Sequence, residues 1–269
     1  MPLESFLDRV DAPTRTLVVA NRSGPEPIQS MLVSTFADQP VEVDERDLPE
    51  VGDDRVLLVE DEEVIATSPL SAIEDTILLV NSDLYRTGTR GIETLDVPDV
   101  IEHLGGVRFS LRGYPKSDRE KLLLIVISRY IEQRAWQAGR GCHRASFQYL
   151  SRIRDERGTR RVYESLAGTD LDVHVYGVPD WLPPEDFAPT AHVGDSHDFR
   201  HSWFVLFRPP GTDGERGASP DGSAAPADTD ARGPVALLAV EREPREWEGF
   251  WTFDPSLVAD LDAYIRREL

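Results

Sequence analysis

The stretch that decides the fold is Ser117-Asp-Arg-Glu-Lys-Leu-Leu-Leu-Ile-Val-Ile-Ser-Arg-Tyr-Ile-Glu-Gln-Arg-Ala-Trp-Gln-Ala138. Its central residues, from Leu122 to Ile127, are all apolar. With about 3.6 residues per turn, six consecutive residues cover every side of a helix. A helix that is apolar all round is buried. The sequence therefore predicts one long helix over 117–138, buried at its middle, as the centre of the fold.

Helical and extended patterns alternate on both sides of this helix. Val107, Phe109 and Leu111 alternate with polar residues, which is the pattern of a half-buried strand. A closing helix is expected from Asp254-Pro255, because a capping carboxylate there precedes a proline at the first helical position. Other helices are expected at 3–10, 25–36, from Ser68-Pro69 to 84, and 158–167. Other strands are expected at 16–20, 55–60, 63–67, 171–175, 203–207, 235–240 and 249–253, with 44–54 as a surface connection. These elements predict the mixed α/β class, a mixed β-sheet flanked by helices.

We expect two parts along the chain. Residues 1–115 form an N-terminal α/β region that packs on the rest, and residues 116–269 form the second part. Within the second part, 209–234 contains no large apolar residue and is rich in Pro, Gly, Ala, Ser and Asp. That composition predicts a disordered loop insertion. It separates two apolar runs that we expect to pair as strands, where extra loop length costs little.

The charge balance indicates the solvent of this protein. The chain has 49 Asp and Glu against 29 Lys and Arg, for a net charge of -20, and its lysines are Lys116 and Lys121. Self-repulsion on this scale destabilises a compact fold in dilute buffer, and salt screens it. We therefore predict a cytoplasmic protein of a halophilic cell. An ordinary acidic protein is the alternative, but it leaves the scarcity of lysine unexplained.

Charge and hydropathy also exclude several classes of function. Binding to nucleic acid needs Lys and Arg gathered on one surface, whereas the arginines between Arg152 and Arg161 are interleaved with acids. The run Leu122 to Ile127 is far shorter than the roughly 20 residues that span a bilayer. The first residues lack the basic and apolar regions of a signal peptide. We expect no nucleic-acid partner, no membrane partner and, with Cys142 as the single cysteine, no internal disulfide.

Catalytic motifs are missing from the sequence. It has no phosphate-binding loop, no Gly-x-Gly-x-x-Gly opening a helix and no Gly-x-Ser-x-Gly elbow. Cys142 directly precedes His143, but a catalytic pair of this kind needs a third, orienting group close by in space. We therefore expect Cys142 to be inert and the protein to be no enzyme, with no catalytic residue, no cofactor and no metal.

A histidine-rich segment keeps one alternative open. His192, His197, Asp198 and His201 carry imidazole and carboxylate groups, which are ligands that zinc and iron accept. A metal-dependent enzyme could use them. Their spacing matches no closed metal motif, so we expect a solvated loop before the strand at Trp203. His174, between Asp172 and Tyr176, is expected to be an ordinary surface histidine.

Aromatic residues beside polar ones suggest a small-ligand pocket. A pocket needs apolar walls with a few polar anchors, and the candidate lining residues are Arg129, Tyr130, Trp181, Trp203 and Trp251. A solid aromatic core is the alternative. Arg129 falls inside the buried helix, where an unpaired guanidinium is very costly. Glu132, or a carboxylate on another element, is its expected partner.

Several short segments, in order, resemble the DICT sensory domain, a family associated with diguanylate cyclases and two-component systems. They are Ile127-Ser-Arg-Tyr-Ile-Glu132, Ser146-Phe-Gln148, the helix over 157–163, Val173-His-Val-Tyr-Gly-Val-Pro-Asp180 and Glu248-Gly-Phe-Trp-Thr-Phe-Asp-Pro255. The resemblance covers 117–269. The preceding residues, including Asn81-Ser-Asp-Leu-Tyr85, are similar to the N-terminal part of free-standing members of the family from halophilic archaea (haloarchaeal members). It implies a sensory domain in signal transduction without catalysis. The usual cyclase, phosphodiesterase and kinase neighbours are missing here.

These observations together predict a non-catalytic sensory or regulatory module. A small ligand or a partner protein would bias two conformations, and a separate signalling protein would read the result. The metal-dependent enzyme and a scaffold that binds only protein remain the alternatives.

Overall fold

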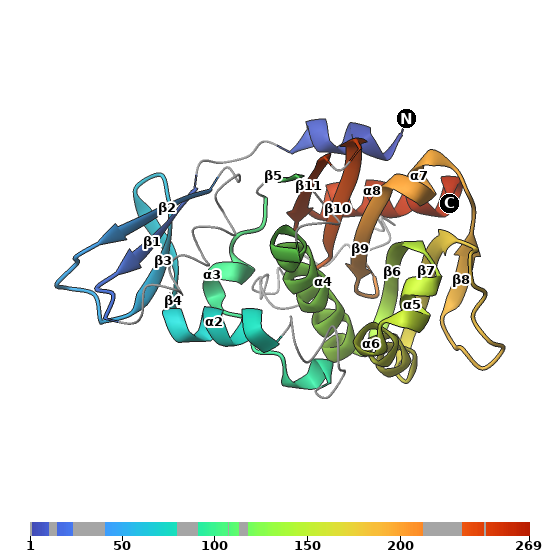
Figure 1. Cartoon of the computed structure of the whole chain (residues 1–269), viewed down its shortest axis with the longest axis horizontal. Coiled ribbons are helices and arrows are strands. Elements are labelled where there is room, and N and C mark those ends of the chain that lie inside the picture. The colour runs from blue at the N-terminus through green and yellow to red at the C-terminus, as the bar shows by residue number, and fades with distance from the viewer. Residues whose placement is uncertain are drawn as a thin grey trace, which may run out of the picture.

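The computed structural model describes residues 2–10, 15–23, 41–79, 91–106, 108–112, 118–211, 233–244 and 246–269. It contains two mixed β-sheets with helices packed on them (Figure 1), which confirms the predicted mixed α/β class. None of the helices in these ranges is long and apolar enough to cross a membrane. The predicted helix at 25–36, the segment 81–85 and most of the predicted loop at 209–234 lie outside the described residues.

The smaller sheet lies at one end of the molecule (Figure 1). Its order is β2-β1-β3-β4, with β1 parallel to β2 and the other neighbours antiparallel. The strands are β1 (Arg15–Ala20), β2 (Val41–Arg46), β3 (Arg55–Glu60) and β4 (Glu63–Pro69). Leu17, Val19 and Leu58 point from this sheet into the main core. That face is covered by α2 (Leu70–Leu79) and α3 (Asp99–Glu102), and η3 (Ile92–Thr94) adds Ile92 to the same core.

The larger sheet has the order β5-β11-β10-β9-β6-β7-β8. Its last three strands run parallel, and the other neighbours are antiparallel. The strands are β5 (Arg108–Arg112), β6 (Arg140–Tyr149), β7 (Asp170–Val178), β8 (Thr190–Val193), β9 (Ser202–Arg208), β10 (Val235–Glu243) and β11 (Glu246–Thr252). The predicted pairing across 209–234 is confirmed, because Phe204 faces Leu238 in an antiparallel β9–β10 pair.

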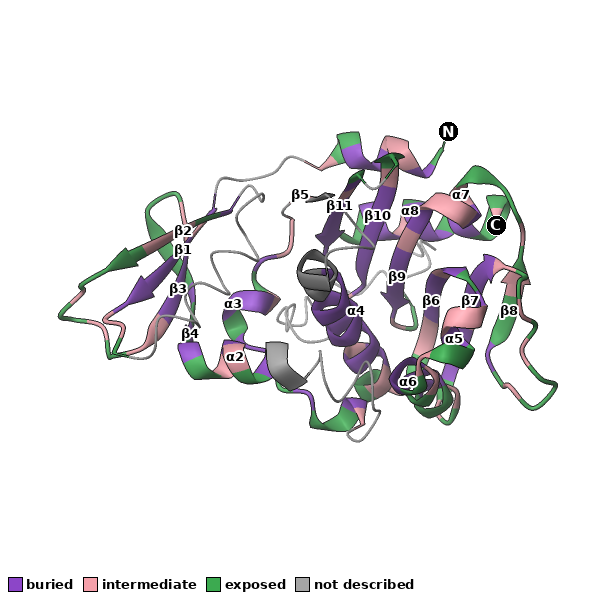
Figure 2. Ribbon diagram, in the orientation of Figure 1, coloured by how far each residue is buried: buried purple, intermediate pink, exposed green. Residues whose placement is uncertain are grey.

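The predicted central helix is α4 (Asp118–Ala138), and its side chains from Leu124 to Gln133 are all buried. Figure 2 shows this stretch between the two sheets. Together with α5 (Ser151–Asp155) and α6 (Arg157–Ala167), α4 covers one face of the larger sheet. It also contacts α2 and η3, so the small sheet, α4 and this face share one core.

The other face of the larger sheet has its own core. It is covered by α8 (Pro255–Glu268), η1 (Leu3–Arg9) and α7 (His197–His201). Leu257 and Leu261 of α8 pack there with Phe204. The carboxylate of Asp254 accepts the backbone N–H of Ser256 at 2.8 Å, which confirms the predicted helix start. The chain on both sides of residue 115 thus contributes to this sheet, since η1 packs on it and β5 pairs with β11.

Three local predictions were wrong. The helix expected from Ser68-Pro69 begins at Leu70, because β4 continues to Pro69. Part of the expected connection at 44–54 is β2, which ends at Arg46. The loop expected around His192 to His201 instead forms β8 and α7.

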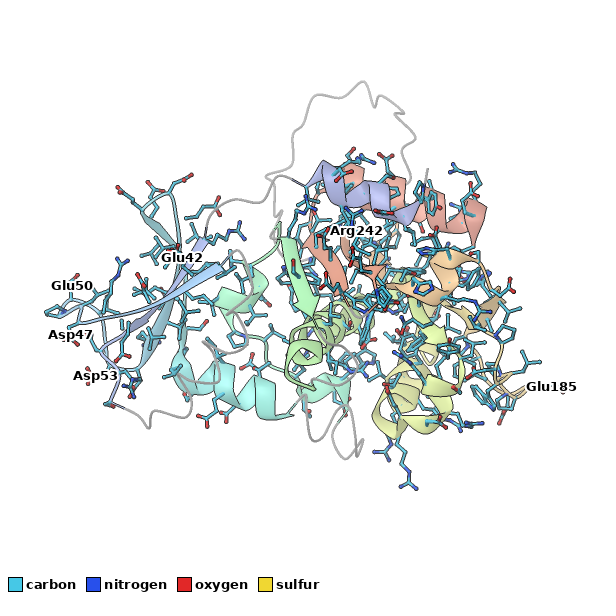
Figure 3. All side chains as sticks on the ribbon, turned by 45° about the horizontal axis from the view of Figure 1, so that its top comes forward. Glu42, Asp47, Glu50, Asp53, Glu185 and Arg242 are labelled. Carbon is cyan, nitrogen blue, oxygen red and sulfur yellow. The ribbon has the colours of Figure 1, made fainter. Side chains whose placement is uncertain are left out.

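The acidic surface follows the predicted charge. Glu42, Asp47, Glu50 and Asp53 extend from the small sheet into solvent, and Glu185 does so at the opposite end (Figure 3). Carboxylates are therefore spread over both ends of the molecule, where salt can screen them.

Candidate functional site

Arg129 and Glu132 form a buried ion pair on α4, one helical turn apart. The Nη1 of Arg129 donates to Glu132, and its Nη2 donates to Oγ1 of Thr159 on α6 at 2.8 Å. Tyr163, also on α6, donates its hydroxyl to Oε1 of Glu132 at 3.0 Å. The predicted partner of Arg129 is thus confirmed, and the pair joins α4 to α6.

The Nε of Arg129 differs from the other guanidinium nitrogens. It is buried and has no hydrogen-bond partner within the described part of the chain. A buried donor without a partner costs about 1–3 kcal/mol. An acceptor atom placed beside this N–H therefore gains a hydrogen bond that no group in the described ranges supplies.

The protonation states of this network follow from burial. Burial alone lowers the pKa of Arg129, but Glu132 outweighs that effect and raises it above its ordinary value. Burial raises the pKa of Glu132, against the pull of Arg129. Burial, with Glu132 beside it, also raises the pKa of Tyr163 well above its usual range. Arg129 stays cationic and Tyr163 keeps its proton, so this tyrosine is a hydrogen-bond donor and no base.

A cavity of about 40 Å³ adjoins the ion pair. At roughly 10–15 Å³ for each water, it has room for about three water-sized groups. Its apolar wall includes Ile125, Ala145 and Val205, from α4, β6 and β9. Its polar lining consists of Ser128, Arg129, Glu132, Ser146, Gln148, Arg152, Glu156, Thr159, Tyr163 and the indole of Trp203. Apolar walls with a few polar groups are typical of small-molecule sites.

Hydrogen bonds hold the polar lining in place. The indole Nε1 of Trp203 donates to Oγ of Ser128 at 3.2 Å, which links β9 to α4. Oγ of Ser146 accepts the backbone N–H of Phe204 at 2.8 Å, which links β6 to β9. The cavity is therefore bounded by groups that are already fixed before anything binds.

The five predicted pocket residues separate into two groups. Arg129 and Trp203 line the cavity. Tyr130 of α4 and Trp251 of β11 pack against each other away from the cavity, with ring centroids 5.8 Å apart, and belong to the solid core. Trp181 is half-buried against the same core. Sequence reasoning missed Ser128, Ser146 and Gln148, although all three fall in segments that carry the family resemblance.

The four residues of the predicted histidine cluster do not converge on one point. His192 lies beside His174, with Nε2 2.9 Å from Nδ1 of His174. Asp198 accepts the hydroxyl of Tyr264 at 2.6 Å, and His201 lies 2.6 Å from Glu241. His197 stacks on His201, with ring centroids 4.6 Å apart.

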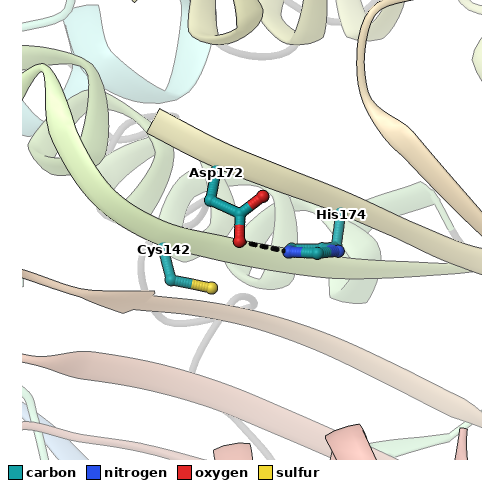
Figure 4. Close-up of side chains that lie close together, drawn as sticks. All are labelled: Cys142, Asp172 and His174. Atoms are coloured by element: carbon teal, nitrogen blue, oxygen red, sulfur yellow. Dashed lines mark ion pairs between the residues drawn. The ribbon is translucent and has the colours of Figure 1, made fainter. Parts of the chain in front are cut away.

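A different group of possible metal ligands comes together instead, at Cys142, Asp172 and His174 (Figure 4). One donor atom from each lies within 4.8 Å of the other two. Nε2 of His174 is 2.8 Å from Oδ2 of Asp172. Burial raises the pKa of Cys142 to about 11, so this thiol is protonated and a poor nucleophile at neutral pH. The side chain of His174 is only 13% exposed, so the surface position predicted for it was wrong.

A second buried ionic network stands next to this group. Asp262 of α8, 2% exposed, accepts from Nε of Arg144 at 2.6 Å and from Nη1 of Arg208 at 2.5 Å. Arg144 also donates to the hydroxyl of Tyr176 at 2.8 Å. The two ion pairs of Asp262 fasten α8 to β6 and β9. Sequence reasoning missed the two ion pairs of Asp262, because their partners are more than 50 residues apart.

No family model, no curated protein and no solved structure matches this chain. What the site does is therefore inferred from its geometry and from the resemblance in its sequence.

Proposed function

We propose that this protein is a non-catalytic sensory or regulatory module that binds a small polar molecule in the cavity beside Arg129. The free Nε–H of Arg129 is the observation that carries this proposal. It calls for a ligand with a hydrogen-bond acceptor. Because Glu132 already balances the charge of Arg129, an uncharged acceptor fits better than an anion.

The resemblance to the DICT sensory domain supports the same location. Three of the segments that carry it meet at the cavity, namely 127–132 on α4, 146–148 on β6 and 157–163 on α6. A binding function shared by a family requires that its characteristic segments contribute side chains to one site. These three segments do so, although they are far apart in the chain.

The central helix offers a route from the cavity to the N-terminal region. Gln133, next to Glu132 on α4, donates to the backbone carbonyls of Ile92 and Leu95. A shift of α4 on binding would move these contacts, and a separate signalling protein would read the change. The ligand can cause this shift only if it binds the shifted position of α4 with higher affinity than the unshifted one.

The acidic surface fits action in the cytoplasm of a halophilic cell, with no role for nucleic acid. The predicted metal-dependent enzyme loses support, because His192 lies apart from Asp198 and His201. A scaffold that binds only protein would have no use for the free donor at Arg129.

The test is to identify small molecules released from the purified protein. The tag-free chain is isolated in high salt, denatured and analysed by mass spectrometry. Ala145→Val places two extra methyl groups at the cavity wall, whereas Ala239→Val makes the same change in the same core away from the cavity. We expect a released compound from wild type and from Ala239→Val, and none from folded Ala145→Val. Release of no compound by wild type, or equal release by Ala145→Val, contradicts the proposal.

A further inference from the structure

The larger sheet carries a possible metal site on the face opposite the Arg129 cavity. We propose that Cys142, Asp172 and His174 bind a zinc ion through a thiolate, a carboxylate and an imidazole nitrogen. All three ligand types bind zinc in proteins. This site is separate from the proposed sensory cavity and goes beyond that function.

Strand register places the three side chains together. β6 and β7 are parallel neighbours, and Cys142 is directly opposite Asp172. Side chains two residues apart on a strand point to the same face, so His174 follows Asp172 on that face. Ala145, which lines the sensory cavity, has the opposite parity on β6 and points the other way. The metal ligands therefore come from two rigid, paired strands.

The hydrogen bonding of His174 favours a cation at this point. Its Nδ1 lies 2.9 Å from Nε2 of His192, so one of these two nitrogens donates to the other. When Nδ1 of His174 is the donor, its Nε2 carries a lone pair directed toward Asp172, 2.8 Å away. That Nε2 is buried and lacks a partner with hydrogen-bond geometry within the described residues. A lone pair beside a carboxylate oxygen is stabilised by a positive ion that both can bind.

His192 completes the arrangement as a positioning residue. Metal-binding histidines commonly use their second ring nitrogen in a hydrogen bond that fixes the orientation of the ring. The ring of His192 is itself held by stacking on Tyr176, with centroids 4.4 Å apart and planes 8° apart. The imidazole of His174 is thus oriented before metal arrives.

Charge around the site allows a divalent cation. Arg144 is close to the thiol, but it is ion-paired with Asp262. Zinc binding displaces the thiol proton to solvent, and the thiolate and Asp172 together balance the charge of the metal. Asp172 is 66% exposed, so the metal reaches the site from solvent. Three protein ligands leave a fourth position of the tetrahedron open to water or another ligand.

Cobalt(II) titration of the tag-free full-length protein tests this proposal. Thiolate bound to cobalt gives a charge-transfer band in the near ultraviolet, and Cys142 is the single cysteine. We expect this band to saturate at one equivalent of cobalt and to disappear when zinc is added. Cys142→Ser should abolish the band. Asp172→Asn, a change at an exposed position, should weaken cobalt binding at least tenfold, and His192→Ala should weaken it by about ten- to a hundredfold.

His197→Ala is the matched control, because His197 is 67% exposed and is not one of the three proposed ligands. It should bind cobalt like wild type, and so should Ala145→Val, which is altered only at the sensory cavity. Absence of the band in wild type overturns the proposal. So does equal weakening by His197→Ala and Asp172→Asn. Neither outcome bears on compounds released from the Arg129 cavity.

Discussion

Arg129 and Glu132 are ion-paired inside α4 with only 4% and 3% of their side-chain surfaces exposed. Removing two charges from water costs several kcal/mol for each ion, and their mutual attraction repays this only when further hydrogen bonds are made. Thr159 and Tyr163 supply such bonds, but the Nε–H of Arg129 donates to no acceptor among the residues that the structure describes. The pair therefore holds α4 against α6, while one donor of Arg129, a residue that lines the cavity, is left without a partner in the described part of the chain.

Glu132→Gln should strongly destabilise the fold. The substitution keeps the shape of the side chain but leaves the charge of Arg129 buried and uncompensated, which costs about 3–5 kcal/mol. Urea unfolding at constant high salt measures this loss. Glu164→Gln is the control, since the Arg160–Glu164 pair on α6 is exposed and such pairs contribute about 0.3–0.5 kcal/mol. Similar losses in the two variants would show that the buried pair contributes no more than a surface one.

Asp262→Asn should also reduce the free energy of unfolding by about 3–5 kcal/mol, because Arg144 and Arg208 both lose their buried counter-charge. Asp260→Asn, two residues earlier on α8, removes the partly exposed pair with Arg9 and should cost less than about 1 kcal/mol. Guanidinium is itself an electrolyte, so urea is the denaturant for this comparison. If Asp262→Asn unfolds at the wild-type urea concentration, α8 does not depend on these arginines.

His143 should make the fold sensitive to acid. Burial lowers its pKa from an ordinary 6.5 to about 3. Between these two values the unfolded chain binds a proton that the folded protein does not, so stability falls as the pH drops below about 6.5. Between these two pKa values, each unit by which the pH falls lowers the free energy of unfolding by about 1.4 kcal/mol. From pH 7.5 to pH 5, wild type should lose about 2 kcal/mol more than His143→Leu. Parallel stability curves for the two proteins across this range would rule the effect out.

Low salt should destabilise the protein. With a net charge of -20, repulsion between carboxylates grows as the Debye length increases from about 3 Å at 1 M salt to about 30 Å at 0.01 M. We expect the melting temperature to fall continuously between these concentrations, in NaCl and KCl alike. Differential scanning calorimetry measures it. An unchanged melting temperature at 0.01 M would remove the basis for predicting a salt-adapted protein.

The sequence predicted those parts of the fold whose signals are local. The apolar stretch at 122–127 predicted α4, and Asp254-Pro255 predicted the start of α8. The cost of burying an unpaired guanidinium predicted a carboxylate partner for Arg129, either Glu132 or one on another element, and the structure shows Glu132 in that role.

Strand β6, which lies between β9 and β7 in the larger sheet, could not be predicted in the same way. It contains Cys142, His143 and Arg144, and its polar residues are buried only because Asp262 and Tyr163 approach from distant helices. Gly141 is part of this strand, with a φ of 113° where the backbone of Arg208 passes close by. The cavity and the group around Cys142 both depend on β6, so neither could be found from local patterns.

The most direct test of the central claim is a high-resolution crystal structure of the protein purified in high salt with nothing added. We predict a bound molecule other than water in the cavity, with an acceptor atom within hydrogen-bond distance of Nε of Arg129. A cavity that contains only water, with that nitrogen bonded to water or to the protein itself, would contradict a ligand-sensing role.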